Sequence, residues 1–259
     1  MTAPQSEDAP ADTGHPLTVA EAIATELRRR GTPERAVKEK AYLKSSLDHY
    51  GVSVPETRAI VTAQLRSVEV GRRAGVGHDF AVEVAQALWD YPIHELRSAA
   101  VMVLIRAKDH LGGGDAALIE RFLRESRTWA LVDPLAGDLV GPLTEVTADF
   151  DPALERWAVD EDFWLRRSAL LAHLRPLRAG GGDFDRFSRF ADVMLQEREF
   201  FIRKAIGWVL RDTAKKRPDL VFEWLLPRAH RASGVTIREA VKPLSPDQQT
   251  ASRAAHSAD

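Results

Sequence analysis

The stretch Arg203-Lys204-Ala205-Ile206 is one copy of a pattern that recurs along the chain: Arg, any residue, Ala and an aliphatic residue. The other copies are Arg97-Ser98-Ala99-Ala100, Arg167-Ser168-Ala169-Leu170 and Arg238-Glu239-Ala240-Val241, with a weaker match at Thr57-Arg58-Ala59-Ile60. The last two gaps are 36 and 35 residues, and the gap of 70 residues before Arg167 leaves space for one divergent copy near residue 132. A period of 35 to 40 residues is typical of two-helix solenoid repeats of the HEAT or armadillo kind.

Apolar residues recur at helical spacing in one block after another, for example at Ile202, Ala205, Ile206 and Val209. The chain shows no sustained two-residue alternation and no Asn-Gly or Asp-Gly hairpin signal. We therefore predict an all-α, HEAT/armadillo-like helical-repeat solenoid with a basic concave face. It would form one curved domain over residues 17–244, between a disordered tail at 1–16 and a flexible tail at 245–259.

Composition excludes several classes of protein. The chain has 259 residues, 44% of them apolar, and its longest apolar runs, such as Ser98 to Ala107, fall well short of a membrane span. The acidic, proline-containing start does not resemble a secretory signal, so we expect a soluble cytoplasmic protein, associated with the nucleoid in a bacterium. Because there is no cysteine, disulfides, thiolate nucleophiles and Cys-ligated zinc are excluded.

The net charge of −2 hides an uneven distribution. Between Phe163 and Lys242 there are 17 Lys and Arg against 9 Asp and Glu, a surplus of +8, so the other residues carry −10. A basic C-terminal half suits a surface that binds a polyanion, although a solvated helix surface can produce the same count.

The divergent repeat places Asp133 where the other copies carry Arg. One carboxylate among guanidiniums, which would keep it ionised, is a candidate reactive group on a face suited to a phosphate backbone. An equally plausible interpretation is structural: Asp before Pro134 is a good helix start, with Asp as the cap and Pro in the first turn.

Aromatic residues accompany cations near these positions. Trp129 precedes Asp133 by four residues, so on a helix the two share a face. Trp208 lies between Lys204 and Arg211 at helical spacing, and Tyr42 lies beside Lys44. Aromatics among cations suit nucleic acids, where rings stack and cations hold phosphates, but helical Trp and Tyr are more often packing residues.

Other chemistries have little support. The eight histidines form no compact ligand spacing, so we expect no metal, and the glycine clusters at Gly112 and Gly180 lack the Gly-Lys-Ser/Thr ending of a phosphate-binding loop. Lys44 or Lys204 could form a Schiff base, but the cationic context of each fits phosphate binding at least as well.

Several stretches resemble the AlkD-type DNA alkylation repair family over residues 40 to 243. The matching stretches are Ala41-Tyr42-Leu43-Lys44-Ser45, Tyr50-Gly51-Val52 with Pro55 and Arg58, Leu88-Trp89 with Glu95, Trp129 with Val132-Asp133, Phe163 to Arg167, Phe200 to Arg211 and Ile237 to Lys242. The Phe200 to Arg211 block is the longest and most specific of them.

The resemblance implies a monofunctional DNA glycosylase that removes N3- and N7-alkylated purines from duplex DNA without extruding the base. It implies Asp133 as the catalytic carboxylate, Trp129 and Trp208 as aromatic walls beside the damaged nucleotide, and Arg167 as a backbone-contacting cation. Further DNA-binding candidates are Tyr42, Lys44, Arg203, Lys204, Arg211, Arg238 and Lys242. We expect base excision repair by a monomer without cofactor or metal.

Two alternatives stay open. A catalytically silent solenoid that binds DNA or protein would keep the cations and aromatics without needing Asp133. A self-resistance glycosylase for one bulky natural-product adduct would act poorly on simple methylated DNA.

Overall fold

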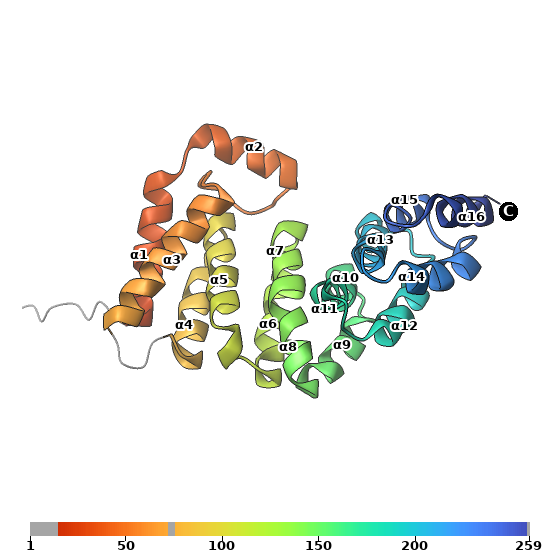
Figure 1. Cartoon of the computed structure of the whole chain (residues 1–259). Helices are drawn as coiled ribbons and strands as arrows, with labels where there is room; N and C mark the ends of the chain where they lie inside the picture. Colours follow the sequence, from red (N-terminus) through yellow and green to blue (C-terminus); the bar gives the residue numbers. More distant parts are fainter. Residues whose placement is uncertain (1–14, 72–75, 258–259) are drawn as a thin grey trace, which may run out of the picture. The chain divides into compact units, whose positions relative to one another are not determined.

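The computed structural model describes residues 15–71 and 76–257, which form helices joined by short connections (Figure 1). Within these ranges there is no β-strand, only an isolated bridge between Asp48 and Ile93. The all-α fold expected from the sequence is confirmed. None of the helices in the described ranges is long and apolar enough to span a membrane.

The chain divides into two compact units, Met1–His110 and Leu111–Asp259. The helices of the N-terminal unit are α1 (Pro16–Arg30), α2 (Pro33–Leu43), α3 (Val54–Gly71), α4 (His78–Trp89) and α5 (His94–Arg106). Those of the C-terminal unit are α6 (Ala116–Ser126), α7 (Trp129–Asp133), α8 (Gly141–Val146), α9 (Asp151–Trp157), α10 (Phe163–Leu171), α11 (Leu174–Ala179), α12 (Phe184–Met194), α13 (Phe200–Ala214), α14 (Pro218–Leu225), α15 (Gly234–Ala240) and α16 (Pro246–His256). The predicted single domain over residues 17–244 stays a prediction.

The predicted tails have different outcomes. Most of the first, residues 1–14, lies outside the described residues, and Pro16 already begins α1. The prediction of a flexible tail at 245–259 was wrong, because α16 occupies most of it. Ser245 caps this helix in a reciprocal capping box with Gln248, and Ser252 is fully buried. Ser252 is the one buried residue of α16.

In the N-terminal unit, α1, α3, α4 and α5 pack against one another, whereas α2 has no buried residue. The buried carboxylate of Glu95, in the first turn of α5, organises the loop that follows α2. It accepts hydrogen bonds from the backbone N–H groups of Tyr50, Gly51 and Val52. Gly51 has a φ of +80°, and a Cβ there would lie 2.2 Å from the carbonyl oxygen of Thr32, so only glycine fits.

The C-terminal unit is built around α13, which packs against α10, α11, α14 and α15. Ile202, Ala205, Ile206 and Val209 of α13 are fully buried, as their helical spacing predicts. The period of about 36 residues therefore corresponds to equivalent helices of successive repeats, α10, α13 and α15, each of which packs against the next.

The same period reappears in the side-chain contacts between repeats. Many ion pairs and hydrogen bonds in this unit join residues 34 to 37 positions apart. They include Arg124 with Asp160, Asp133 with Arg167, Arg178 with Asp212, Asp192 with Arg228, and Lys204 with Glu239, and the neutral pair of Trp224 with Ser188. Side chains of one repeat thus make polar contacts with side chains about one period later in the next repeat. This confirms the helical-repeat architecture.

The repeated Arg residues do not all occupy one structural position. Arg97 and Arg203 lie four residues after the caps of their helices, Ile93 and Glu199. Each turns back to a backbone carbonyl, Arg97 to Trp89 and Tyr91, and Arg203 to Glu197.

A second group of residues lies one position further into its helices than Arg97 and Arg203 do. Arg167 and Arg238 lie five residues after their caps, as do Asp133 and Lys204. Asp133 therefore shares its position with Arg167, Lys204 and Arg238, and the predicted register was wrong for Arg97 and Arg203.

We predict that Gly207→Ala destabilises the protein by about 1 to 3 kcal/mol, since an added methyl group overpacks a tight helix contact. A Cβ at Gly207 would lie 2.8 Å from Cβ of Glu239 and 3.1 Å from the carbonyl oxygen of Thr236. Urea unfolding would measure the difference. Gly114→Ala is the control, because no atom lies within 4 Å of a Cβ built there; an equal effect of the two substitutions would contradict the prediction.

Candidate active site

Asp133 lies within a continuous helical stretch. Thr128 caps α7 by accepting a hydrogen bond from the backbone N–H of Ala130, and Asp133 itself has helical φ and ψ of −63° and −47°. Its side chain makes no capping hydrogen bond. The capping interpretation of Asp133 and Pro134 is therefore wrong, and the carboxylate is available for another partner.

The helix widens directly after Asp133. Residues 134–140 form a π-helical segment before the chain continues into α8. Pro134 has no N–H group and cannot take part in regular α-helical bonding, which gives a local cause for the wide turns. Further along, a Cβ at Gly141 would lie 2.8 Å from the carbonyl oxygen of Ala172, so this segment closely approaches the end of α10.

Arg167 of α10 binds both oxygens of the Asp133 carboxylate. Its Nε and Nη2 atoms each lie 2.8 Å from one carboxylate oxygen, which is the bidentate geometry of a strong charge-assisted pair. Its third nitrogen, Nη1, donates to the carbonyl oxygen of Phe201. The side chain of Arg167 is 3% exposed and that of Asp133 is 15% exposed, so the acid reaches the surface and the cation does not.

Burial, rather than the cations, dominates the electrostatics of Asp133. Desolvation raises the pKa of Asp133 above its ordinary value of 3.8, and the hydrogen bonds and charge of Arg167 offset only part of this effect. The sequence-based expectation that nearby guanidiniums keep Asp133 ionised names the weaker influence on its pKa, because burial outweighs Arg167. A partly dehydrated carboxylate interacts more strongly with a cation than a solvated one does.

A cluster of aromatic rings adjoins Arg167. The guanidinium carbon of Arg167 lies 5.7 Å from the ring centre of Phe201, which in turn lies 4.9 Å from that of Trp164. Phe163 packs 4.4 Å from Trp164. The sequence analysis gave these rings no role, but Phe201 contacts Arg167 through both its ring and its carbonyl oxygen, and Trp164 packs against the ring of Phe201.

Trp129 begins α7, one helical turn before Asp133, and is half-buried. The two residues share a face of the helix, as their four-residue spacing predicts. An aromatic side chain therefore adjoins the carboxylate on the same helix.

Trp208 lies on α13 and its indole nitrogen donates to Asp212, with 3.3 Å between the atoms. Asp212 is 1% exposed and also pairs with Arg178 and Lys215. These hydrogen bonds lower the pKa of Asp212 despite the opposing effect of burial. The orientation of Trp208 is thus set by a buried ionised carboxylate that motif reading missed.

A second carboxylate gathers the predicted cations around Trp208. Glu239 pairs with Lys204 at 2.7 Å, with Lys242 at 3.0 Å, and with Arg211. Burial opposes ionisation of Glu239, but hydrogen bonds from Lys204 and Lys242, together with the charges of Lys204 and Arg211, lower its pKa to about 2. Glu239 belonged to the repeat pattern, yet nothing in the sequence indicated that it would bind three cations.

One stripe of α13 connects the two groups of residues. Phe201, Lys204, Trp208 and Arg211 recur at three- and four-residue spacing, so they lie on one side of the helix. Phe201 contacts Arg167, the partner of Asp133, and Lys204 and Arg211 contact Glu239. The structure therefore brings most of the predicted C-terminal site residues into one connected network.

The remaining predicted DNA-binding residues lie outside this network. Arg203 is half-buried and its Nε donates to a backbone carbonyl, whereas Arg238 is exposed. Tyr42 is 74% exposed and Lys44 adopts a left-handed conformation at the end of α2, with a φ of +50°. Both belong to the N-terminal unit, so their part in the site stays a prediction.

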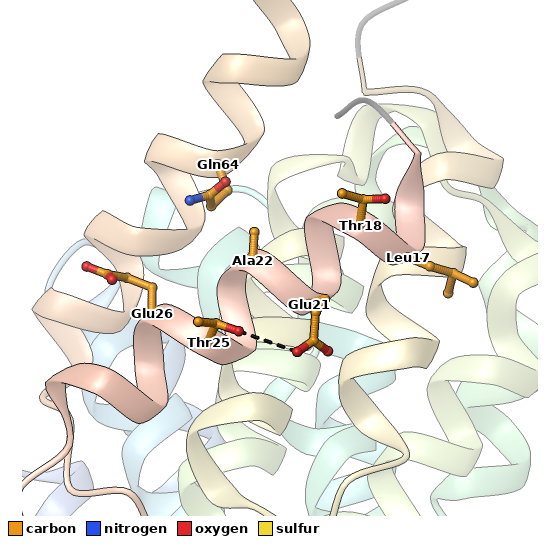
Figure 2. A pocket seen from close by; sticks show the side chains of 7 residues that line it. All are labelled: Leu17, Thr18, Glu21, Ala22, Thr25, Glu26 and Gln64. Atoms are coloured by element: carbon orange, nitrogen blue, oxygen red, sulfur yellow. Dashed lines mark hydrogen bonds between the residues drawn. The ribbon is translucent and has the colours of Figure 1, made fainter. Parts of the chain in front are cut away.

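A shallow groove of about 690 Å³ lies between α1 and α3 (Figure 2). Its lining includes the acids Glu21 and Glu26 and no cation, and Glu21 accepts a hydrogen bond from Thr25. A groove of this charge does not suit a polyanion, so the residues around Asp133 are the better candidate site.

Comparison with known proteins identifies the family. A family model described as DNA alkylation repair enzyme matches residues 23–244. The chain belongs to the DNA alkylation repair enzyme family. The matched range covers most of both units and contains all the candidate site residues named above.

Solved structures show the same fold. A protein from Enterococcus faecalis, described as a predicted DNA alkylation repair enzyme, aligns with a TM-score of 0.72 at 23% identity, covering 83% of this chain and 97% of the other. AlkD2 from Streptococcus mutans aligns with a TM-score of 0.60 at 15% identity, covering 88% and 99%. No curated protein matches significantly.

We predict that Arg167→Met further raises the pKa of Asp133, because burial would persist without the compensating cation. The unpaired buried charge would also lower the free energy of unfolding at neutral pH by about 3 to 5 kcal/mol. Carboxyl carbon NMR titration and urea unfolding would measure the two effects.

The double variant Arg167→Met with Asp133→Asn should regain part of this stability, since no charge is then left unpaired. Arg189→Met, which removes an exposed pair with Glu155, is the matched control. An unchanged Asp133 pKa in Arg167→Met would show that the pair does not govern this carboxylate.

Proposed function

We propose that the enzyme is a monofunctional DNA glycosylase that hydrolyses the N-glycosidic bond of cationic N3- or N7-alkylated purines in duplex DNA, in base excision repair. The observation that supports this most directly is the Asp133 carboxylate, partly exposed, dehydrated and fixed by the buried Arg167. Membership of the DNA alkylation repair enzyme family supports DNA as the substrate.

The proposed chemistry needs little from the protein at the leaving group. Alkylation at N3 or N7 gives the purine a formal positive charge, so the base departs without a general acid. As the glycosidic bond breaks, the deoxyribose gains oxocarbenium character, and a preorganised anion stabilises that developing charge. Asp133 would supply this anion and then orient or deprotonate the attacking water.

The pair with Arg167 suits this role. Each carboxylate oxygen of Asp133 accepts one guanidinium hydrogen bond, which leaves further lone pairs on both oxygens. Because Arg167 is buried and its Nε, Nη1 and Nη2 atoms all donate, it acts as a positioning residue for Asp133. We therefore propose this role for Arg167 in place of the backbone contact suggested by the family resemblance.

The surrounding residues would bind the DNA. Lys204, Lys242 and the exposed Arg238 are cations with substantial accessible surface, suited to phosphates. Trp129 and Trp208, both half-buried, would pack against the sugar and exclude water, and the indole of Trp208 is held by its hydrogen bond to Asp212. We further propose, from the family resemblance, that the reaction proceeds without extruding the damaged base, unlike that of base-flipping glycosylases.

We expect Asp133→Asn to lower base release from a duplex carrying a single 7-methylguanine by about 10² to 10³, since an electrostatic stabiliser of the transition state is lost. Single-turnover release of the base would measure it. The control is Asp138→Asn, which removes a more exposed carboxylate from the same helical stretch. Equal rates for wild type and Asp133→Asn would rule out the catalytic role.

The same assay separates the alternatives. A wild type inactive on 7-methylguanine but active on a bulky cationic adduct would indicate a self-resistance glycosylase. A protein that binds DNA, with and without Asp133→Asn, yet releases no base from either substrate would be a silent binder.

Lys242→Ala should weaken binding to DNA of any sequence and reduce the slope of log K against log salt by about 0.9, the value of one phosphate contact. Fluorescence anisotropy at several salt concentrations would measure both changes. Arg189→Ala, which removes an exposed cation from α12, should leave the slope unchanged. A salt-independent affinity of the wild type would contradict phosphate binding altogether.

A further inference from the structure

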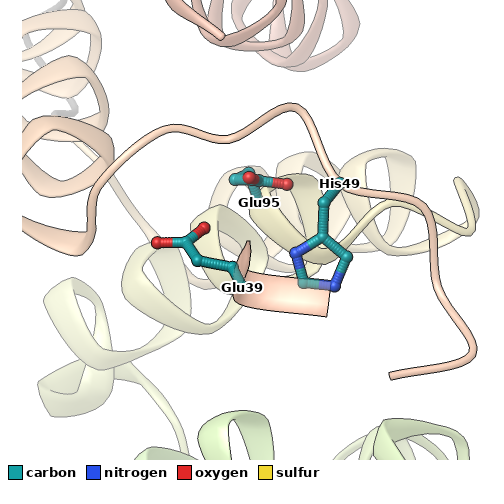
Figure 3. Close-up of side chains that lie close together, drawn as sticks. All are labelled: Glu39, His49 and Glu95. Atoms are coloured by element: carbon teal, nitrogen blue, oxygen red, sulfur yellow. The ribbon is translucent and has the colours of Figure 1, made fainter. Parts of the chain in front are cut away.

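Three side chains with metal-binding atoms converge in the N-terminal unit (Figure 3). Glu39 comes from α2, His49 from the loop that follows it, and Glu95 from the first turn of α5. One atom from each residue lies within 4.8 Å of the other two. They are 10 and 46 residues apart in sequence, so only the fold brings them together.

The imidazole of His49 lacks polar partners. Both of its ring nitrogens are buried without a hydrogen bond, and its ring stacks on that of His94, with 4.7 Å between the ring centres and 10° between the planes. A buried nitrogen without a partner is costly and rare, so a ligand that accepts a lone pair would remove a real penalty.

The two carboxylates retain capacity for a further ligand. Oε1 of Glu95 accepts the N–H groups of Gly51 and Val52, whereas Oε2 accepts only that of Tyr50, at 3.0 Å. Glu39 pairs through Oε1 with the exposed Arg35, at 2.7 Å. A carboxylate oxygen has two lone pairs, so at least one oxygen of each acid could reach a cation.

The charges of these three side chains also suit a divalent cation. A neutral imidazole together with two carboxylates balances the charge of such an ion.

We propose that Glu39, His49 and Glu95 form a binding site for a divalent transition-metal cation of the Zn²⁺ type. One imidazole nitrogen and two carboxylate oxygens are ligands that such ions accept, with water completing the coordination. At metal-ligand bonds of about 2.0 to 2.1 Å the ligand atoms lie about 3.3 Å apart, so these side chains close by up to about 1.5 Å on binding.

The bound ion would fasten α2 to the rest of its unit. α2 has no buried residue and so has little apolar packing of its own to hold it. The cation would connect it to the loop and to α5, which already share the hydrogen bonds of Glu95. This role is structural and independent of the proposed glycosylase reaction.

The test uses the full chain, free of affinity tag and treated with chelator. Titration with Zn²⁺ should give one ion per chain with micromolar or tighter affinity, and Co²⁺ should produce a visible absorption band of a protein-bound ion. A hundredfold excess of Zn²⁺ over its Kd should raise the Tm of the transition that reports on the N-terminal unit by about 10 °C.

Glu39→Gln and His49→Gln should each weaken Zn²⁺ binding at least tenfold and abolish the Co²⁺ band. Glu34→Gln on the same helix and His110→Gln are the matched controls and should bind as the wild type does. Tm values measured in chelator would confirm that Glu39→Gln, a change on an exposed helix, still folds. Absence of wild-type binding, or wild-type affinity in both ligand variants, would overturn the proposal.

Discussion

The bidentate pair between Arg167 and Asp133 is the interaction on which the candidate site depends. It joins two successive repeats 34 residues apart and commits a buried guanidinium to a carboxylate at the surface. Burying the arginine requires neighbours that satisfy its remaining donor, and the carbonyl oxygen of Phe201 on α13 does so. Through that contact, α13 at the centre of the unit helps to hold Arg167, and with it the Asp133 carboxylate, in place.

The pair is one example of a wider arrangement. Carboxylates and cations of successive repeats pair with one another, as Asp212 does with Arg178 and Glu239 does with Lys204. Many cations counted in the basic C-terminal half therefore have a partner, while the surplus of +8 remains. The repeat interface and the candidate DNA surface thus use the same side chains, which links the stability of the unit to the geometry of its site.

The sequence motifs selected the candidate site residues but did not predict the contacts that connect them. Asp133, Trp129 and Trp208 stood out because an acid and aromatics occurred among cations at helical spacing. Glu239 and Asp212, which organise those cations and Trp208, gave no signal, since carboxylates on a charged helix look like ordinary surface residues. The capping role considered for Asp133 was wrong, because Thr128 caps α7 and Asp133 lies five residues further along the same helical stretch.

The sequence by itself determined the all-α class, the repeat period and the buried stripe of α13, because hydrophobic periodicity and propensity are local properties that recur with each repeat. It also identified the acid that interrupts the row of basic positions. Only the tertiary structure decided which cation holds that acid and that Glu39, His49 and Glu95 meet. These depend on contacts between residues distant along the chain, which no local pattern encodes.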